Sequence, residues 1–123
     1  MNNKSKKILI VEDERAIARA LELKLSHSGF SVKVVGNGEE ALQILEKEKF
    51  DLVLLDLVMP KLDGFGVLKG LAEKNIKTKI IVVSNLSQEE DRRKAKELGA
   101  SSFFVKSDTP ITDIVSEVKK ILS

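Results

Sequence analysis

Four short apolar runs, each followed directly by polar side chains, constrain the fold of this chain more than any other feature. The runs cover residues 8–11, 52–55, 80–83 and 103–105, and the residues that follow them are Glu12 with Asp13, Asp56, Ser84 and Lys106. Parallel strands that are buried on both faces have such near-continuous hydrophobic sequences. Because ligands bind outside the carboxyl ends of the strands in an open α/β sheet, these five side chains are predicted to form one polar cluster.

Helical patterns separate the apolar runs, and the chain alternates between strand and helix from end to end. Strands are predicted at about residues 7–11 and 31–35, and three more strands end at Asp56, Ser84 and Lys106. Helices are expected at about residues 14–28, after Asn37, at 65–74, at 87–98 and after Thr109. This alternation predicts a flavodoxin-like α/β fold, in which a doubly wound (βα)5 chain places helices on both faces of a five-stranded parallel sheet.

Short signals mark where the helices begin and end. Ser87 with Glu90 has the spacing of a capping box, so the helix at 87–98 is predicted to begin there. Thr109 is predicted to cap the last helix, with Pro110 in its first turn. Gly29 is predicted to end the first helix, because glycine readily adopts the left-handed backbone conformation found at helix C-termini.

The expected topology favours a common site over separate structural roles for these residues. In the strand order 2-1-3-4-5 the switch point, where ligands bind, lies between the strands that end in Glu12-Asp13 and in Asp56. Taken singly, Glu12 and Asp13 could begin a helix, where acids are favourable. Asp56 could belong to a turn, Ser84 could be a plain hydroxyl, and Lys106 could be a solvated strand end. Their shared position at the ends of neighbouring strands favours a functional cluster.

The cluster has the composition of a metal-assisted phosphoryl-transfer site. Its three carboxylates and one lysine leave a net charge of −2, which one divalent cation would neutralise. Oxygen ligands without histidine or cysteine suit Mg²⁺, for which Mn²⁺ can substitute. A carboxylate can act as a nucleophile and form an aspartyl phosphate. A metal ion, a lysine and a hydroxyl group can then neutralise the phosphoryl oxygens.

Length and composition narrow the classes of function. The 123 residues are expected to form one domain at 7–123, preceded by a flexible N-terminal arm at 1–6. The chain has no cysteine, no apolar run long enough to span a bilayer and no signal peptide, which predicts a cytoplasmic protein that does not associate with membranes. A net charge of +2 is too small to indicate binding to nucleic acid.

The motifs around the cluster resemble the receiver domain of bacterial response regulators, here a stand-alone, chemotaxis-receiver-like domain of two-component signalling. The resemblance extends over essentially the whole chain and rests on residues 8–14, 51–60, 63–64, 84 and 99–106. It implies that Asp56 accepts a phosphoryl group from a sensor histidine kinase or a histidine phosphotransfer protein. It also implies an output surface on the helix at 87–98, the strand that ends at Lys106 and the helix after Thr109, for an unknown output protein or a phosphorylation-linked homodimer.

The resemblance further implies a role for each residue of the cluster. Four oxygen ligands would hold Mg²⁺, from Glu12, Asp13, Asp56 and the backbone carbonyl of Val58. Ser84 and Lys106 would contact the phosphoryl group. Ser84 and Phe103 would form the switch, in which the aromatic ring changes rotamer when the hydroxyl group moves toward the phosphoryl group. Phe103 lacks a tyrosine hydroxyl, so this switching would depend on packing alone.

Four positions depart from the commonest pattern of the family. Glu12 replaces an aspartate, and Ser84 replaces a threonine while keeping the hydroxyl group. Asn85, a candidate phosphate contact, is larger than the residue usual there and could either obstruct the approach of phosphate or donate a hydrogen bond to it. Ser107 stands where a proline usually follows a cis peptide bond. Because a cis bond to serine costs about 3–4 kcal/mol, a trans bond and a locally altered loop are predicted.

Several functions remain open at this stage. The leading one is a switch that responds to phosphorylation of Asp56 and does not act as a multiple-turnover enzyme on an external substrate. The alternatives are an intermediate phosphate carrier in a relay, since no DNA-binding segment follows the last helix, and a pseudo-receiver that is never phosphorylated. A phosphatase would need a further acid or base and a cap over the site. A flavin-binding domain would need a hydroxyl-rich loop where this chain has Glu12 and Asp13.

Two apolar residues are expected to flank the site. Val58 and Leu86 each lie two positions after a predicted site residue, Asp56 and Ser84 respectively. Apolar side chains orient water poorly, so the phosphoryl group is predicted to be lost slowly by hydrolysis.

Overall fold

The computed structural model describes residues 6–86 and 88–123, and in this part of the chain strands and helices alternate as predicted. The strands are β1 Lys7–Val11, β2 Ser31–Val35, β3 Leu52–Leu55, β4 Lys79–Ser84 and β5 Ser102–Val105. The α-helices are α1 Arg15–His27, α2 Gly38–Lys47, α3 Gly64–Glu73, α4 Glu89–Glu97 and α5 Ile111–Leu122, and a 3₁₀ turn, η1, covers Lys106–Asp108. Apart from Lys6, the predicted arm at 1–6 lies outside the described residues.

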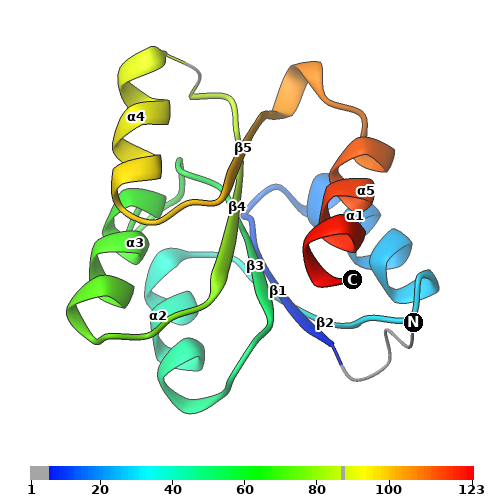
Figure 1. The fold of residues 1–123 in the computed structure, drawn as a ribbon, viewed down its shortest axis with the longest axis horizontal. Coiled ribbons are helices and arrows are strands. Elements are labelled where there is room, and N and C mark those ends of the chain that lie inside the picture. Colours follow the sequence, from blue (N-terminus) through cyan, green and yellow to red (C-terminus); the bar gives the residue numbers. More distant parts are fainter. Residues whose placement is uncertain (1–5, 87) are drawn as a thin grey trace.

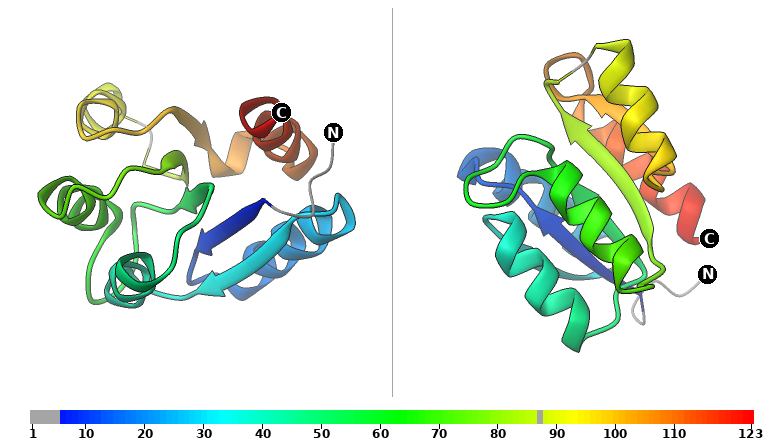
Figure 2. Two further views of the ribbon diagram at one scale, coloured as in Figure 1. Left: turned by 60° about the horizontal axis from the view of Figure 1, so that its bottom comes forward. Right: turned by 90° about the vertical axis from the view of Figure 1, so that its left-hand side faces the viewer.

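All the strand pairings are parallel, and the strands lie in the order β2-β1-β3-β4-β5. Figure 1 shows the sheet between two helical layers, with α2, α3 and α4 on one face and α1 and α5 on the other. The two further views in Figure 2 show the same layers. The predicted (βα)5 flavodoxin-like fold is therefore confirmed. Among the described residues, no helix combines the length and the apolar character needed to cross a membrane.

The central strands are apolar throughout because they contribute to two separate cores. In β1, Leu9 and Val11 pack in the core beneath α2, α3 and α4, whereas Ile8 and Ile10 pack in the core beneath α1 and α5. Every residue of β3 is buried in the same alternating way. The run at 103–105 was expected to be equally buried, but it is only half-buried, because β5 is an edge strand of the sheet.

The predicted N-caps of α4 and α5 are each wrong by one residue. Gln88, rather than Ser87, occupies the N-cap of α4, and its backbone N–H donates to Asp91 Oδ2 at 3.3 Å. Ser87 itself lies outside the described residues. Pro110, rather than Thr109, occupies the N-cap of α5, because its extended backbone (ψ 146°) keeps it outside the helix.

Candidate phosphorylation and metal site

The register of β1 and β3 brings the predicted acidic residues together. Val11 pairs with Leu55, so Glu12 and Asp56, the residues that follow them, leave the sheet next to each other. The Asp56 N–H donates to the Val11 carbonyl at 3.0 Å, which fixes this arrangement. One carboxylate oxygen each from Glu12, Asp13 and Asp56 lie within 4.8 Å of one another. These oxygens could hold a metal ion, and an all-oxygen set of this kind suits Mg²⁺.

Lys106 lies among these carboxylates because of the register between β4 and β5. Ser84 pairs with Val105, which places Lys106 at the same carboxyl edge of the sheet. The Lys106 Nζ atom lies 2.9 Å from Glu12 Oε1, 3.0 Å from Asp56 Oδ2 and 2.8 Å from Glu14 Oε1. The side chains of Lys106, Glu12 and Asp56 are 8%, 3% and 4% exposed. One nearly buried ammonium group is therefore shared by three carboxylates.

Sequence reasoning did not identify Glu14 as a residue of this cluster. The helix α1 was expected to begin at residue 14, but it begins one residue later, with Glu14 at the N-cap. The Glu14 carboxylate makes no capping hydrogen bond and pairs with Lys106 across 92 positions of sequence. The only signal was that Glu14 is the third acid in succession after β1, and the first turn of a helix is an ordinary place for such an acid.

The protonation of Glu12 and Lys106 follows from their burial and their partners. Burial raises the pKa of Glu12, and hydrogen bonds from Lys106 and from the Glu14 N–H offset this effect only in part. Burial alone would lower the pKa of Lys106, but the hydrogen bonds to Glu14, Glu12 and Asp56 outweigh it and raise that pKa above its usual value. The cluster therefore holds a firmly charged lysine and at least one carboxylate whose charge is disfavoured.

Because the folded protein disfavours the charge on Glu12, Glu12→Gln should increase the free energy of unfolding in EDTA at pH 7.5. A raised carboxyl pKa in the folded state means that the cost of ionisation is fully present above that pKa and absent below the pKa of the unfolded chain. The gain over wild type should therefore disappear as the pH falls to about 4. Urea unfolding of both proteins at several pH values measures this gain in the free energy of unfolding.

The exposed Glu73, at the end of α3, provides the matched control, and Glu73→Gln should change stability by less than about 0.5 kcal/mol at every pH. In the presence of Mg²⁺, wild type should instead be more stable than Glu12→Gln, because a neutral glutamine is a weaker metal ligand than a carboxylate. A Glu12→Gln variant that is less stable than wild type in EDTA at pH 7.5 would contradict the prediction.

Ser84 and Phe103 lie on neighbouring strands near this cluster. Ser84 is fully buried at the end of β4, and its Oγ accepts a hydrogen bond from the Leu86 N–H at 3.3 Å. Phe103 is half-buried in β5, and the Arg92 guanidinium group of α4 lies 5.0 Å from the centre of its ring. Lys94 of α4 likewise lies 4.4 Å from the centre of the Phe65 ring.

The loop after Lys106 has the predicted trans geometry. No cis peptide bond occurs within residues 6–86 and 88–123, which includes the bond between Lys106 and Ser107. The altered loop is the turn η1, and its Ser107 N–H donates to Asn85 Oδ1 at 2.8 Å. Asn85 is exposed and makes this hydrogen bond with its side-chain oxygen.

The two apolar residues predicted beside the site are exposed. Val58 is 55% exposed and Leu86 is 36% exposed, which is unusual for side chains of this size in the structure. The Val58 N–H donates to Asp56 Oδ1 at 3.2 Å and so helps to orient that carboxylate. A metal contact of the Val58 carbonyl stays a prediction.

Gly64 allows α3 to begin directly against the Asp56 backbone. A Cβ atom at position 64 would lie 2.5 Å from the Asp56 carbonyl oxygen and 2.7 Å from the Leu57 Cα atom, both of them backbone atoms that cannot easily shift. The Gly64 N–H also donates to the Leu57 carbonyl at 3.0 Å. Any larger residue at this position would displace the backbone that carries Asp56.

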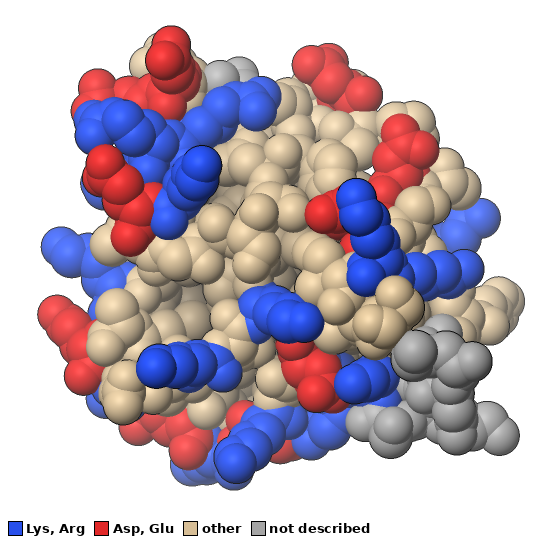
Figure 3. Space-filling model, in the orientation of Figure 1, with Lys and Arg blue, Asp and Glu red and all other residues tan. Residues whose placement is uncertain are grey.

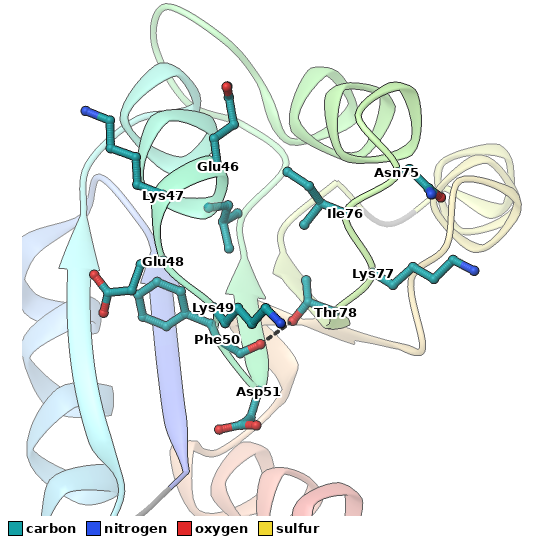
Figure 4. A pocket seen from close by; sticks show the side chains of 11 residues that line it. Glu46, Lys47, Glu48, Lys49, Phe50, Asp51, Asn75, Ile76, Lys77 and Thr78 are labelled. Atoms are coloured by element: carbon teal, nitrogen blue, oxygen red, sulfur yellow. Dashed lines mark hydrogen bonds between the residues drawn. The ribbon is translucent and has the colours of Figure 1, made fainter.

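A cavity of about 690 Å³ lies at the opposite edge of the sheet, between the end of α2 and the segment that leads into β4. Figure 4 shows its lining, in which Thr78 Oγ1 donates to the Phe50 carbonyl at 2.9 Å. Acidic and basic side chains alternate around it, and those of Glu46, Lys47, Lys77 and Asp51 point in different directions. No set of ligand atoms converges there, so the chemistry of the described residues is concentrated at the carboxyl edge.

Comparison with known proteins agrees with this geometry. Residues 8–119 match the family described as the response regulator receiver domain. The chain is 41% identical over 122 residues to the probable transcriptional regulator ycf27 of Porphyra purpurea, which covers 99% of this chain and 49% of that protein. It is 39% identical over 118 residues to the alkaline phosphatase synthesis transcriptional regulatory protein PhoP of Bacillus subtilis (strain 168). This match covers 96% of this chain and 49% of that protein. The chain thus spans about half the length of these curated relatives.

Solved structures of the same fold are also similar. The receiver domain of the Francisella response regulator 1452 superposes with a TM-score of 0.89 at 28% identity, covering 95% of this chain and 96% of that one. A CheY-like response regulator receiver domain protein from Methanospirillum hungatei JF-1 gives a TM-score of 0.85 at 28% identity, and the match covers 94% of this chain and 91% of that one. The family match, the fold and the acidic cluster at the switch point together show that this chain belongs to the response regulator receiver domains of two-component signalling.

Proposed function

We propose that this receiver domain is a switch operated by Mg²⁺-dependent phosphorylation of Asp56. The observation that carries the proposal is the position of Asp56, which is 4% exposed, shares the metal-type cluster with Glu12 and Asp13, and lies 3.0 Å from Lys106 Nζ. An Asp56 carboxylate oxygen forms a bond to phosphorus while the bond from phosphorus to the nitrogen of a partner's phosphohistidine breaks. The partner is a sensor histidine kinase or a histidine phosphotransfer protein.

The charges of the cluster support this assignment. Glu12, Asp13 and Asp56, with the Val58 carbonyl, would hold Mg²⁺, which when bound supplies positive charge to the phosphoryl oxygens. Once Glu12 serves as a metal ligand it no longer depends on Lys106 for neutralisation. The Lys106 ammonium group is then free to pair with a phosphoryl oxygen while it stays beside Asp56. Ser84 would donate its hydroxyl to the same group, with Asn85 as a further candidate contact.

The output of the switch would be a change on the face formed by α4, β5 and α5. Ser84 would move toward the phosphoryl group and Phe103 would change rotamer, which would alter the contact between its ring and Arg92. On this face, Figure 3 shows basic and acidic side chains gathered over α4 and an uncharged stretch across the middle. A surface of this mixed kind suits an output protein or a second copy of the chain.

Intact mass after incubation with acetyl phosphate and Mg²⁺ tests the proposal. A gain of one phosphoryl group, about 80 Da, that requires Mg²⁺ would support it. No gain under any condition would favour the pseudo-receiver. Rapid transfer from phosphorylated protein to a histidine phosphotransfer protein, without any change in self-association or partner binding, would favour the relay carrier. After the first equivalent, donor should be consumed only as fast as the aspartyl phosphate is hydrolysed, because we propose no multiple-turnover activity on an external substrate.

The exposed apolar side chains beside the site should make the phosphorylated state long-lived. Val58→Asn or Leu86→Asn should speed the loss of phosphate by roughly 10-fold, because a polar side chain can orient the attacking water. Decay of the phosphorylated mass after removal of the donor measures this rate. Leu23→Asn, which alters a similarly exposed leucine on α1, is the control and should decay like wild type. Unchanged decay in both site variants would contradict the prediction.

A further inference from the structure

One side-chain hydrogen bond joins the loops that leave β4 and β5. Asn85 Oδ1 accepts from the Ser107 N–H at 2.8 Å, although the two residues are 22 positions apart in the sequence. Each partner directly follows a residue of the site, because Asn85 comes after Ser84 and Ser107 comes after Lys106. The two loops leave the same edge of the sheet, at the top in Figure 1.

The donor in this hydrogen bond belongs to the peptide unit that links Lys106 to Ser107. Fixing the direction of that N–H therefore fixes the plane of the peptide bond on the carboxyl side of the Lys106 Cα. Lys106 has a long side chain with four rotatable bonds, and its Nζ atom lies 3.0 Å from Asp56 Oδ2. The backbone from which this side chain extends thus limits where the ammonium group can lie.

The hydrogen bond also accounts for the residue types at both positions. Asn85 supplies a short side chain with an acceptor oxygen, and a small apolar residue would have none. Ser107 supplies a backbone N–H, and a proline would have none. The two departures from the commonest family pattern, which seemed unrelated in the sequence, are therefore the two halves of one contact.

We propose that Asn85 is a positioning residue for phosphoryl acceptance, which acts by binding the Ser107 N–H and so holding Lys106 beside Asp56. The inference rests on the proposed phosphorylation of Asp56 and adds a contact that sets its rate. Steric obstruction, in which Asn85 would hinder the approach of the donor, predicts the opposite effect on the rate. Under obstruction, replacing Asn85 with a smaller residue would speed phosphorylation, whereas under this inference it slows phosphorylation. Because the hydrogen bond is exposed, its loss should slow phosphorylation by about 2- to 10-fold, the usual worth of one hydrogen bond.

The first test is the phosphorylation rate of Asn85→Ala over a range of acetyl phosphate concentrations at saturating Mg²⁺, followed by intact mass. The limiting rate should fall, while the Mg²⁺ concentration for half-maximal rate should stay the same. The urea midpoint of unfolding should fall only by the small amount that the loss of one exposed hydrogen bond explains. If Asn85 had only a structural role, the limiting rate would be unchanged at temperatures where both proteins are folded, whatever the change in the urea midpoint. A limiting rate equal to or faster than wild type would overturn the proposal.

A double-mutant cycle with Ser107→Pro tests the contact itself. Ser107→Pro removes the donor but keeps the Asn85 side chain, so it should also slow phosphorylation, whereas obstruction by Asn85 predicts no such effect. The double variant should be no slower than the slower single variant, because both changes remove the same hydrogen bond. Multiplied effects in the double variant would show that the two residues act separately and would overturn the proposal.

Asp108→Asn, an exposed change on the same turn η1, is the control and should phosphorylate like wild type. The wild-type result separates this inference from the function on which it rests. A wild-type protein that gains no mass overturns the proposed function and this inference together. A wild-type protein that gains mass at the same rate as Asn85→Ala overturns this inference alone.

Discussion

Asp56→Ala should abolish phosphorylation by acetyl phosphate, so that the gain of about 80 Da seen in wild type is absent from the variant. Asp56 is the only carboxylate of the described cluster that lies both at the end of β3 and against Lys106. Its nearest acidic neighbours, Glu12 and Asp13, are proposed to be metal ligands. Without Asp56, the carboxylates left beside the Lys106 ammonium group are those of Glu12, which is proposed to be a metal ligand, and of Glu14, whose side chain is 57% exposed. No carboxylate then remains at the proposed acceptor position at the end of β3.

Asp63→Asn is the matched control for this experiment. Asp63 caps α3 by accepting from the Gly66 N–H at 2.9 Å, and asparagine is an equally good N-cap, so the fold and the segment after Asp56 should persist. This variant should gain the same mass as wild type. A mass gain in Asp56→Ala would show that another residue accepts the phosphoryl group, and peptide mapping would then identify it.

The second large effect should be on stability. Lys106→Met should lower the free energy of unfolding by about 3 kcal/mol at pH 7.5 in EDTA, because removing one partner of a buried ion pair leaves uncompensated charge. Glu12 and Asp56, each 4% exposed, would lose the cation that they share. Glu14 should contribute little, since its side chain is 57% exposed and water can solvate it. Methionine keeps the length of the lysine stem, so the loss reports charge rather than packing.

Two conditions should restore part of this stability. Mg²⁺ should stabilise Lys106→Met more than it stabilises wild type, because a metal ion can neutralise the same carboxylates. Lowering the pH should also reduce the loss, because Glu12, whose pKa burial raises, takes up a proton and no longer needs a cation. Urea unfolding with and without Mg²⁺ measures both effects.

Lys69→Met is the control, because Lys69 is exposed on α3 and forms no ion pair within the described residues. It should change stability by less than about 0.5 kcal/mol. If Lys106→Met were as stable as wild type in EDTA, the three ion pairs of Lys106 would not contribute to folding.

The sequence determined the topology and the identity of most of the site. Its apolar runs are long enough to mark strands but too short for helices, and the absence of alternation in 8–11 and 52–55 indicates burial on both faces. Both features are local, so they can be recognised without knowing the rest of the fold. Right-handed crossovers then leave few ways to order five parallel strands. Since parallel strands all point the same way, acids placed after two of them must meet at one edge.

The sequence predicted the helix boundaries less well, because two neighbouring residues can both suit the N-cap position of one helix. Ser87 and Gln88 both suit the start of α4, as do Thr109 and Pro110 for α5. Differences of this kind depend on small backbone preferences that the packing of the whole helix overrides. Burial of β5 was likewise misjudged, because no local pattern in 103–105 reveals that the strand lies at an edge.

Only the tertiary structure decided which polar atoms meet. The pairing of Lys106 with Glu14 spans 92 positions of sequence, and the contact between Ser107 and Asn85 spans 22. Glutamate and asparagine are common on the surface, and neither residue type specifies a partner so far along the chain. Hydrogen bonds and ion pairs depend on distances of about 3 Å, and only the folded backbone sets distances on that scale between segments so far apart in the sequence.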